Sequence, residues 1–499
     1  MFKIIILLLI SITAQANICL QLTDDVPVLA GGRVKPYFVL AKESLKHLTG
    51  KPTYQKQSAT SVFCQIMFQK RLHKVFDLPI KVEHLKTKKL LQLSDQTSHA
   101  LASSLMSKMQ IIRAEIFKQK ENNSYKKDLT KLFNRISTYE QILQQKALSV
   151  YTEQNGTEMD NAWETIAMHS SLNDDKLSQL IKHSKEKYIK SHNDKYLIEL
   201  TYVKSNIFSY AMLIALIGIF LVVLLKNLKW GVLLAIITIL IETVGMAMRI
   251  YISGRAPITN MYETVLFSGY GALIIALIIV FFKRDKIFIL AGLSYNILCL
   301  FMMMFANNML NSSISPLVPV LRDNFWLSTH VTTIMLSYAA LALSWIVANI
   351  TLVKLQLKKL TKKDYRYHQE LIYTCIKVGI VLLATGIILG GVWADYSWGR
   401  FWGWDPKETW SLIVLLFYMV LVHGRYSSWI TTHRFVVLSA AGFMTVMMAW
   451  FGVNYILASG LHSYGFSEGG AIFLGSFFVT QIIILIVLGN KVNFQGVND

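Results

Sequence analysis

Long apolar runs separated by short polar connectors occupy the chain from residue 207 onward. A helix of about 20 apolar residues crosses the roughly 30 Å hydrocarbon core of a membrane. The runs give nine candidate membrane helices, at 207–226, 230–250, 262–282, 287–306, 331–353, 371–391, 411–423, 435–457 and 469–489. The seventh is short unless its helix begins in the preceding tryptophan-rich segment, near Lys407. The pattern predicts an all-α, polytopic membrane helix bundle over 207–489, with a cytoplasmic tail at 490–499.

Residues 17–206 contain no apolar run long enough to span a membrane. Between Ser103 and Val150, apolar residues recur at three- or four-residue spacing, which is the period of an amphipathic helix. The stretch at 122–124 breaks this pattern, as the turn of a helical hairpin would. We therefore expect a mainly helical soluble domain ahead of the membrane region.

The first 16 residues have the pattern of a secretory signal peptide. Lys3 supplies the positive charge, Ile4 to Ile12 the apolar core, and residues 14–16 a small-x-small cleavage site. An uncleaved membrane anchor is the alternative, but the apolar run is too short to span the bilayer comfortably. Residues 17–206 are exported under either interpretation, so the soluble domain should be periplasmic.

Lysine and arginine gather in every second connector of the membrane region. The basic connectors are at 226–229, 283–286, 354–366 and 425–434. Cytoplasmic loops carry the excess of these residues, so the first membrane helix should start outside and the last should end inside. The other connectors, which should face the periplasm of a bacterial inner membrane, are at 251–261, 307–330, 392–410 and 458–468.

Composition fits a membrane protein, since 53% of the 499 residues are hydrophobic and 16% are charged. Much of the formal net charge of +20 falls in the basic connectors and the lysine-rich soluble segment, so we expect no nucleic-acid partner. The four cysteines form no C-x-x-C pair that would indicate a zinc or redox site. Cys19 and Cys64 lie in the exported part and can form a disulfide, whereas Cys299 and Cys375 should be small buried residues.

The densest chemical feature is the stretch from Trp393 to Trp410, where five tryptophans, a tyrosine and a phenylalanine fall within 18 residues. Trp and Tyr favour the membrane interface, so an interfacial aromatic belt is one interpretation. The other is an aromatic shelf for a flat conjugated ligand such as a porphyrin, which Gly399 and Gly403 would allow close to the backbone. Chemistry alone leaves the two balanced. Asp405-Pro406 is a natural helix start.

Two histidines share the outer compartment with this segment, His330 at the start of the fifth helix and His462 after the eighth. A single histidine at a helix end is usually an interfacial residue, but two on one side of the membrane can ligate haem iron from both faces. His423 lies 13 residues beyond Trp410, roughly 20 Å along a helix. It is either a functional residue at membrane depth or a marker of the cytoplasmic helix end.

Three further charged residues lie in or beside the apolar runs. Glu242 and Arg249 fall on nearby turns of the second helix, and Glu263 begins the third. Buried pairing among them and contact with the propionates of a porphyrin both remain open.

Residues 393–413 resemble the tryptophan-rich "WWD" segment of haem-handling proteins, W-A-x-x-x-W-G-x-(Y/F)-W-x-W-D-P-K-E-T-W-x-L-I. They are most similar to the CcsA (ResC) half of the CcsB–CcsA cytochrome c synthase of System II. The resemblance extends over roughly 207–489. It includes the connector from Arg255 to Glu263 and the segments around His330 and His462.

The resemblance implies a role for each candidate site residue. His330 and His462 would hold the haem iron outside the membrane, and the porphyrin would lie on Trp393, Trp398, Trp402, Trp404, Asp405 and Trp410. His423 would be one ligand of haem inside the membrane. No second histidine lies within a predicted span, because His368 and His433 fall in predicted cytoplasmic loops. We therefore expect either that a CcsB/ResB-like membrane partner supplies the missing ligand or that the haem site inside the membrane is weaker.

The resemblance also implies a reaction with haem b as substrate. Apocytochrome c would present a C-x-x-C-H motif whose thiols form thioethers with the haem vinyl groups, while His330 and His462 serve catalysis by positioning haem. Periplasmic thiol-reducing proteins are further candidate partners. Two rival interpretations stay open: a haem transporter or chaperone without synthase activity, and a structural subunit of an unrelated transporter.

Overall fold

The computed structural model describes residues 18–120, 123–152, 162–306, 309–316, 323–457 and 469–490. It divides into two compact units, Met1–Lys204 and Ser205–Asp499. The division falls two residues before the boundary expected from the sequence. The predicted signal peptide, His462 and the tail from 491 onward lie outside the described residues.

The N-terminal unit is mainly helical, with three small two-stranded antiparallel sheets among its described residues. Its helices are α1 (Ile18–Gln21), α2 (Tyr37–Thr49), α3 (Ala59–Met67), α4 (Leu85–Leu90), α5 (Ala102–Ser107), α6 (Met109–Lys118), α7 (Ser124–Leu143), α8 (Asp174–His192) and α9 (Leu197–Ser205). The sheets pair β1 (Pro27–Ala30) with β2 (Arg33–Pro36), β3 (Pro79–Lys81) with β4 (His99–Leu101), and β5 (Ser149–Tyr151) with β6 (Trp163–Thr165). The predicted helical hairpin corresponds to α5, α6 and α7, and the helix expected as far as Val150 is wrong at its end because β5 begins at Ser149.

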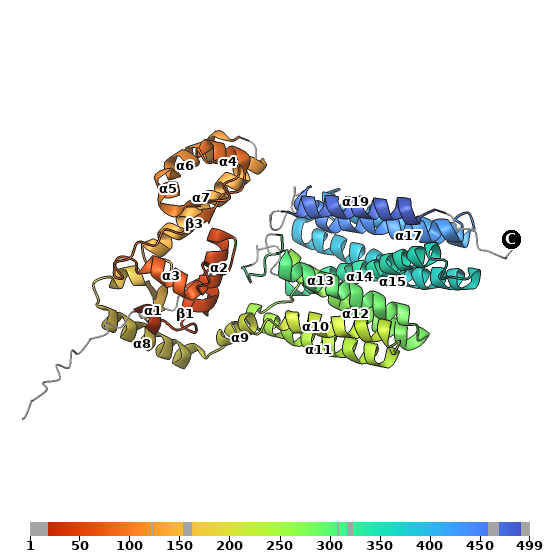
Figure 1. Cartoon of the computed structure of the whole chain (residues 1–499), viewed down its shortest axis with the longest axis horizontal. Coiled ribbons are helices and arrows are strands. Elements are labelled where there is room, and N and C mark those ends of the chain that lie inside the picture. Colours follow the sequence, from red (N-terminus) through yellow and green to blue (C-terminus); the bar gives the residue numbers. More distant parts are fainter. Residues whose placement is uncertain are drawn as a thin grey trace, which may run out of the picture. The chain divides into compact units, whose positions relative to one another are not determined.

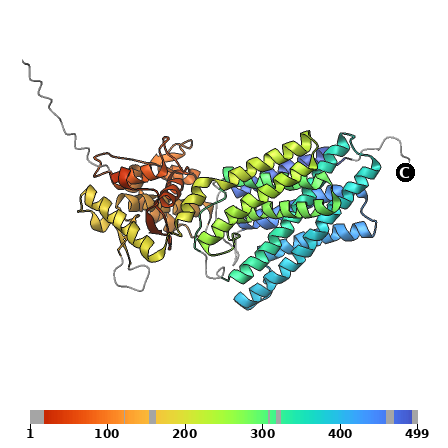
Figure 2. The ribbon, with the colours of Figure 1, turned by 90° about the horizontal axis from the view of Figure 1, so that it is seen from below.

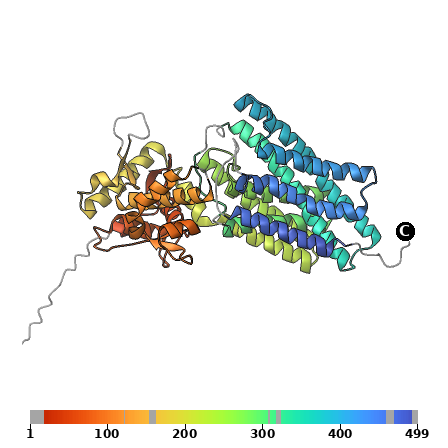
Figure 3. The same ribbon diagram turned by 90° about the horizontal axis from the view of Figure 1, so that it is seen from above.

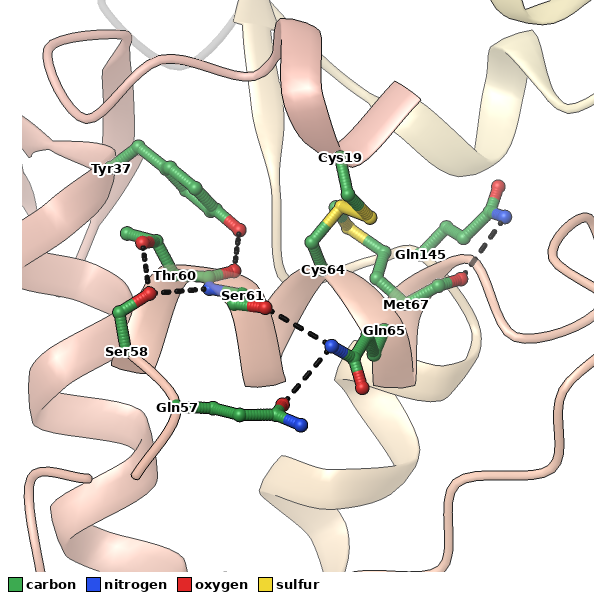
Figure 4. The surroundings of a disulfide bond; sticks show 10 residues. All are labelled: Cys19, Tyr37, Gln57, Ser58, Thr60, Ser61, Cys64, Gln65, Met67 and Gln145. Atoms are coloured by element: carbon green, nitrogen blue, oxygen red, sulfur yellow. Dashed lines mark hydrogen bonds between the residues drawn. A yellow bond between two sulfur atoms is a disulfide. The ribbon is translucent and has the colours of Figure 1, made fainter. Parts of the chain in front are cut away.

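A disulfide between Cys19 and Cys64 ties α1 to α3, with the two Cα atoms 5.7 Å apart (Figure 4). Beside it, the Tyr37 hydroxyl donates to the carbonyl of Thr60 at 2.9 Å. Cys64 and Tyr37 belong to the apolar core in which α2, α3 and α7 meet. The disulfide thus joins the first described helix to the main core of the unit.

Nine helical spans among the described residues are long and apolar enough to cross a membrane; the first, Leu197–Leu224, begins in α9, and the other eight lie within the second unit. Its helices are α10 (Ile207–Leu224), α11 (Leu228–Ser253), α12 (Met261–Lys283), α13 (Lys286–Phe305), α14 (Asn324–Gln356), α15 (Lys362–Trp398), α16 (Pro406–Tyr426), α17 (Thr432–Met447), α18 (Val453–Tyr455) and α19 (Gly470–Leu488). A π-helical turn, Met448–Gly452, joins α17 to α18. Figure 1, Figure 2 and Figure 3 show these long helices side by side within the unit. The predicted all-α membrane bundle is confirmed.

Two helices run well beyond the apolar runs that predicted them. The Asp323 carboxylate accepts hydrogen bonds from the backbone N–H groups of Phe325 and Trp326 and so starts α14 seven residues early. A capping box formed by Thr361 and Asp364 likewise starts α15 nine residues early. Caps of this kind are made by polar side chains at or beside the helix start, so a hydropathy pattern does not reveal them.

These longer helices correct several placements. His368 lies inside α15, and His433 inside α17, so neither is in a cytoplasmic loop. At the other end of α15, Trp393 and Trp398 are helical. The tryptophan-rich connector expected at 392–410 is therefore only the turn at 399–405.

Candidate functional site

A cavity of about 200 Å³ lies at the end of the membrane unit that the charge pattern assigns to the outside. Its wall comes from the α11–α12 connector, the start of α12, the first half of α14, the end of α15, the turn at 399–405, the start of α16, the π-helical turn and α18. The aromatic side chains among its lining residues are Tyr338, Trp393, Trp398, Phe401, Trp402 and Trp450. The cavity therefore lies between part of the tryptophan-rich segment and the start of α14.

His330 lines this cavity from the second turn of α14. Its Nδ1 lies 2.8 Å from the carbonyl oxygen of Gly386 on α15. A carbonyl oxygen can only accept, so Nδ1 carries a proton, and a neutral ring held in this way would have its lone pair on Nε2. In histidines that bind a metal through one ring nitrogen, a hydrogen bond from the other ring nitrogen commonly fixes the orientation of the ring. The imidazole also packs against Trp393, with ring centroids 5.8 Å apart.

The five tryptophans of the predicted shelf fall into two groups. Trp393, Trp398 and Trp402 line the cavity. Trp404 does not, since its side chain is 69% exposed and its ring meets Trp402 edge-on at 5.8 Å. Trp410 is not a lining residue either, although Glu408 and Ser411 of the same helix are. The described geometry thus brings together three of the five rings assigned to the porphyrin.

Asp405 shapes the turn rather than the cavity wall. Its Oδ1 accepts hydrogen bonds of 2.9 Å from the backbone N–H groups of Lys407 and Glu408, and Pro406 stands at the first helical position. Glu408 completes the capping box and also accepts from the Gly403 N–H at 2.6 Å. The predicted helix start is confirmed, and the structure gives Asp405 a capping role.

His462, the second proposed axial ligand, lies outside the described residues, and its role stays a prediction. The description of the chain stops at Leu457 and resumes at Gly469. Asn454, three residues before Leu457, lines the cavity.

His423 lies near the opposite end of α16 from the cavity. Its ring is exposed on the helix surface, and its Nδ1 is 2.8 Å from the carbonyl of Met419. Arg425 beside it pairs with Glu370 and covers the Tyr373 ring at 4.0 Å. The structure therefore does not bring His423 to His330. No cluster of three or more His, Cys, Asp or Glu side chains suited to a metal ion occurs in the described part of the chain.

A buried ion pair holds one wall of the cavity. Arg249 Nε and Glu263 Oε1 are 2.6 Å apart, and both side chains are almost fully buried. The other carboxylate oxygen of Glu263 accepts from the backbone N–H and the hydroxyl of Thr259, at 2.6 and 2.7 Å. Arg249 also donates to the carbonyl of Ser312 at 3.0 Å. The sequence left open whether Arg249 and Glu263 pair with each other or contact the propionates of a porphyrin, and the structure shows them paired.

Several lining residues were missed by the sequence analysis. Tyr338, Trp450 and Asn454 belong to apolar runs, where nothing in the pattern separates a cavity-facing side chain from a packed one. Lys407 was noted only as a possible helix start. The sequence did contain an indication of its importance. A lysine in the first turn of a helix is electrostatically unfavourable, because the N-terminal end of the helix dipole is positive.

Residues 258–462 match the family model described as "Cytochrome C assembly protein". The chain is 34% identical over 294 residues to the cytochrome c biogenesis protein CcsA of Guillardia theta, covering 52% of this chain and 95% of that protein. It is 32% identical to CcsA of a Synechococcus species over 47% of this chain and 86% of that protein. The protein NrfI of Wolinella succinogenes is 37% identical over 45% of this chain and 25% of its own length.

Among solved structures, the cytochrome c haem lyase CcmF aligns with 57% of this chain and 50% of its own, at 15% identity. The TM-score of this alignment is 0.42.

Proposed function

The chain belongs to the CcsA family of cytochrome c biogenesis proteins, and from this premise we propose that it holds haem in the His330 cavity for covalent attachment to apocytochromes c. The observation that carries the proposal is the tautomer of His330. The Gly386 carbonyl fixes Nδ1 as the donor, so Nε2 is the atom that can ligate iron. Aromatic walls around it suit the faces of a porphyrin.

The size of the cavity limits how haem binds. Sites for small molecules usually enclose about 300–1,000 Å³, whereas this cavity holds about 200 Å³. A macrocycle must therefore push lining side chains aside or project from the cavity. A projecting edge is useful here, because the vinyl groups have to be reached by a second protein.

His462 is the proposed ligand on the second face of the haem. It follows Asn454, a lining residue of the cavity, by eight residues in the sequence. This closeness in the sequence supports the proposal.

The proposed reaction adds two cysteine thiols across the two haem vinyl groups. Each sulfur bonds to one vinyl carbon and the thiol hydrogen ends on the other, so the addition needs no oxidant. The chain would contribute positioning, which turns a bimolecular encounter into an oriented one. Thiol reactivity is set by the ionisation of the thiol itself, so no side chain of this site has to act as a general base.

We also propose that His423 ligates haem within the membrane, together with a histidine of a CcsB-like partner. Exposure of the His423 ring on α16 supports this, because another chain can reach it there. The inner bacterial membrane, with the N-terminal unit in the periplasm, is the proposed location. The alternation of basic connectors supports it.

The experiment that tests the synthase proposal supplies purified full-length chain, with its partner, with reduced haem and a C-x-x-C-H peptide. A covalent haem–peptide product, found by mass spectrometry, is expected from the wild type and not from His330→Ala/His462→Ala. Haem binding without a covalent product would contradict the synthase proposal and support the alternative, a haem transporter or chaperone.

A further inference from the structure

A lysine lies on the outer surface of a membrane-spanning helix without a carboxylate partner. Lys377 stands within α15, inside the apolar run that predicted this span, and its side chain is exposed. Its ammonium group lies 4.8 Å from the ring centroid of Tyr373, one turn earlier in the helix. It forms no ion pair with the described residues. An ammonium group in a membrane span is costly unless it reaches the interface or a counter-ion, so this position favours an anion.

A second cation lies over the same aromatic ring. Arg425, in the last turn of α16, has its Cζ 4.0 Å from the ring centroid of Tyr373. It pairs with Glu370 of α15, whose side chain is 59% exposed. The Tyr373 hydroxyl makes no hydrogen bond with the described residues. Around this ring, two cations and a hydroxyl donor thus face a single carboxylate, which leaves a net positive charge that suits an anionic acceptor.

The surface around this cluster changes from interfacial to apolar along the helices. Tyr426, next to Arg425, is 88% exposed, and tyrosine favours the level of the lipid headgroups. One turn further into the span from Lys377, the side chain of Val381 is 65% exposed, and Val420 of α16 is 51% exposed. A ligand with an anionic head and an apolar tail matches this order, whereas a free anion would use only the cations.

We propose that Lys377, Arg425 and Tyr373 bind the phosphate of an anionic phospholipid, whose acyl chains lie along the exposed apolar surface of α15 and α16. The two helices pack against each other, and the cluster lies at the end of the unit that the basic connectors assign to the cytoplasm. Basic pockets between membrane helices on that side are typical sites for anionic headgroups. None of the cluster residues lines the cavity at His330, so this lipid site is separate from the proposed haem site.

The test is a competition between two lipids with identical acyl chains, phosphatidylglycerol and phosphatidylcholine, followed by native mass spectrometry of the full-length chain in mild detergent. The wild type should bind phosphatidylglycerol roughly fivefold better, as one uncompensated cation near an anionic headgroup predicts. Lys377→Gln should remove most of this preference. Glu370→Gln removes the competing carboxylate and should increase the preference. Because the two variants act in opposite directions, a general loss of structure cannot produce both results.

The matched control is Lys229→Gln, which removes an exposed lysine from the first turn of α11, in another basic connector. It should leave the preference as in the wild type. Equal binding of the two lipids by the wild type would overturn the proposal, as would the same loss in Lys229→Gln and Lys377→Gln. If millimolar inorganic phosphate displaced phosphatidylglycerol, the site would be one for free anions and the lipid would be the wrong occupant.

Discussion

The imidazole of His330 is held between two helices by a close fit. The Gly386 carbonyl binds its Nδ1, and Gly390, one turn further along α15, leaves room for the ring. A Cβ atom at Gly390 would stand 2.6 Å from His330 Cε1 and 2.9 Å from Nδ1. Since no real Cβ contact is that short, any side chain at this position must displace the imidazole.

We therefore predict that Gly390→Ala weakens haem binding through His330. Overpacking of this kind costs about 1–3 kcal/mol, and the displaced ring should lower haem affinity by roughly tenfold or more. Added imidazole should restore a low-spin spectrum, because it replaces the displaced ligand. The control is Gly475→Ala in α19, where a Cβ would meet nothing within 4 Å. Identical haem spectra and affinities for the two variants would contradict the prediction.

At the scale of single residues, the sequence drew attention to particular side chains but did not show how they are arranged. It singled out His330 and the tryptophans, because the residue types and their density are unusual. It did not separate the cavity-lining Trp393 and Trp402 from the exposed Trp404. That separation depends on where α15 ends: Gly399 caps it with φ of 68°, and Trp404 follows at φ of 55°, both in the left-handed region.

Among the elements, the connector between α11 and α12 depends on a single ion pair. Glu263 binds Arg249 with one oxygen and Thr259 with the other. The connector contributes Thr259 and Asn260 to the cavity. The pair therefore supports a wall of the site, although neither Arg249 nor Glu263 is itself a lining residue. The sequence suggested pairing among Glu242, Arg249 and Glu263. In the structure Glu242 is not part of this pair, and its carboxylate accepts a hydrogen bond of 2.8 Å from the side-chain amide of Asn296.

Glu263→Gln should destabilise the membrane unit, because it leaves the buried guanidinium of Arg249 without a countercharge. Breaking a buried pair costs about 3–5 kcal/mol, against about 0–1 kcal/mol for an exposed one. The midpoint temperature of thermal unfolding in detergent should be clearly lower for Glu263→Gln than for the wild type. Glu370→Gln, which breaks the exposed pair with Arg425, should show little change. Equal shifts in the two variants would mean that the buried pair is not a structural support.

Over the whole molecule, hydropathy and charge predicted the main architecture. The nine membrane helices and the mainly helical N-terminal unit are present among the described residues. The small sheets of the N-terminal unit were missed, since each strand is only three or four residues long and carries no clear alternation. The helix ends at α14 and α15 were missed because capping side chains, rather than apolar residues, set them.

The Cys19–Cys64 disulfide gives a test of the proposed export of the N-terminal unit. Structural disulfides persist in oxidising compartments and are rare in the cytoplasm. The other two cysteines, Cys299 and Cys375, are free and buried. Denatured protein from cells should therefore take up two maleimide groups before reduction and four after it. Four labels without reductant would place the unit in a reducing compartment.

The same bond should also stabilise the N-terminal unit. It closes a loop over a sequence separation of 45 residues, for which loop entropy predicts about 4 kcal/mol, with about 2–5 kcal/mol as the usual range. Cys19→Ser/Cys64→Ser should make the unit more sensitive to protease and to denaturant. Cys375→Ser, which alters a cysteine outside any disulfide, serves as the control and should leave the protease sensitivity of the N-terminal unit unchanged.

The central claim, that the cavity at His330 holds haem iron, is tested most directly by the absorption spectrum of the purified full-length chain with its partner. We predict the spectrum of low-spin haem with two histidine ligands, lost in His330→Ala/His462→Ala and restored in part by imidazole in each single variant. A wild-type protein without haem, or an unchanged spectrum in the double variant, would contradict the account.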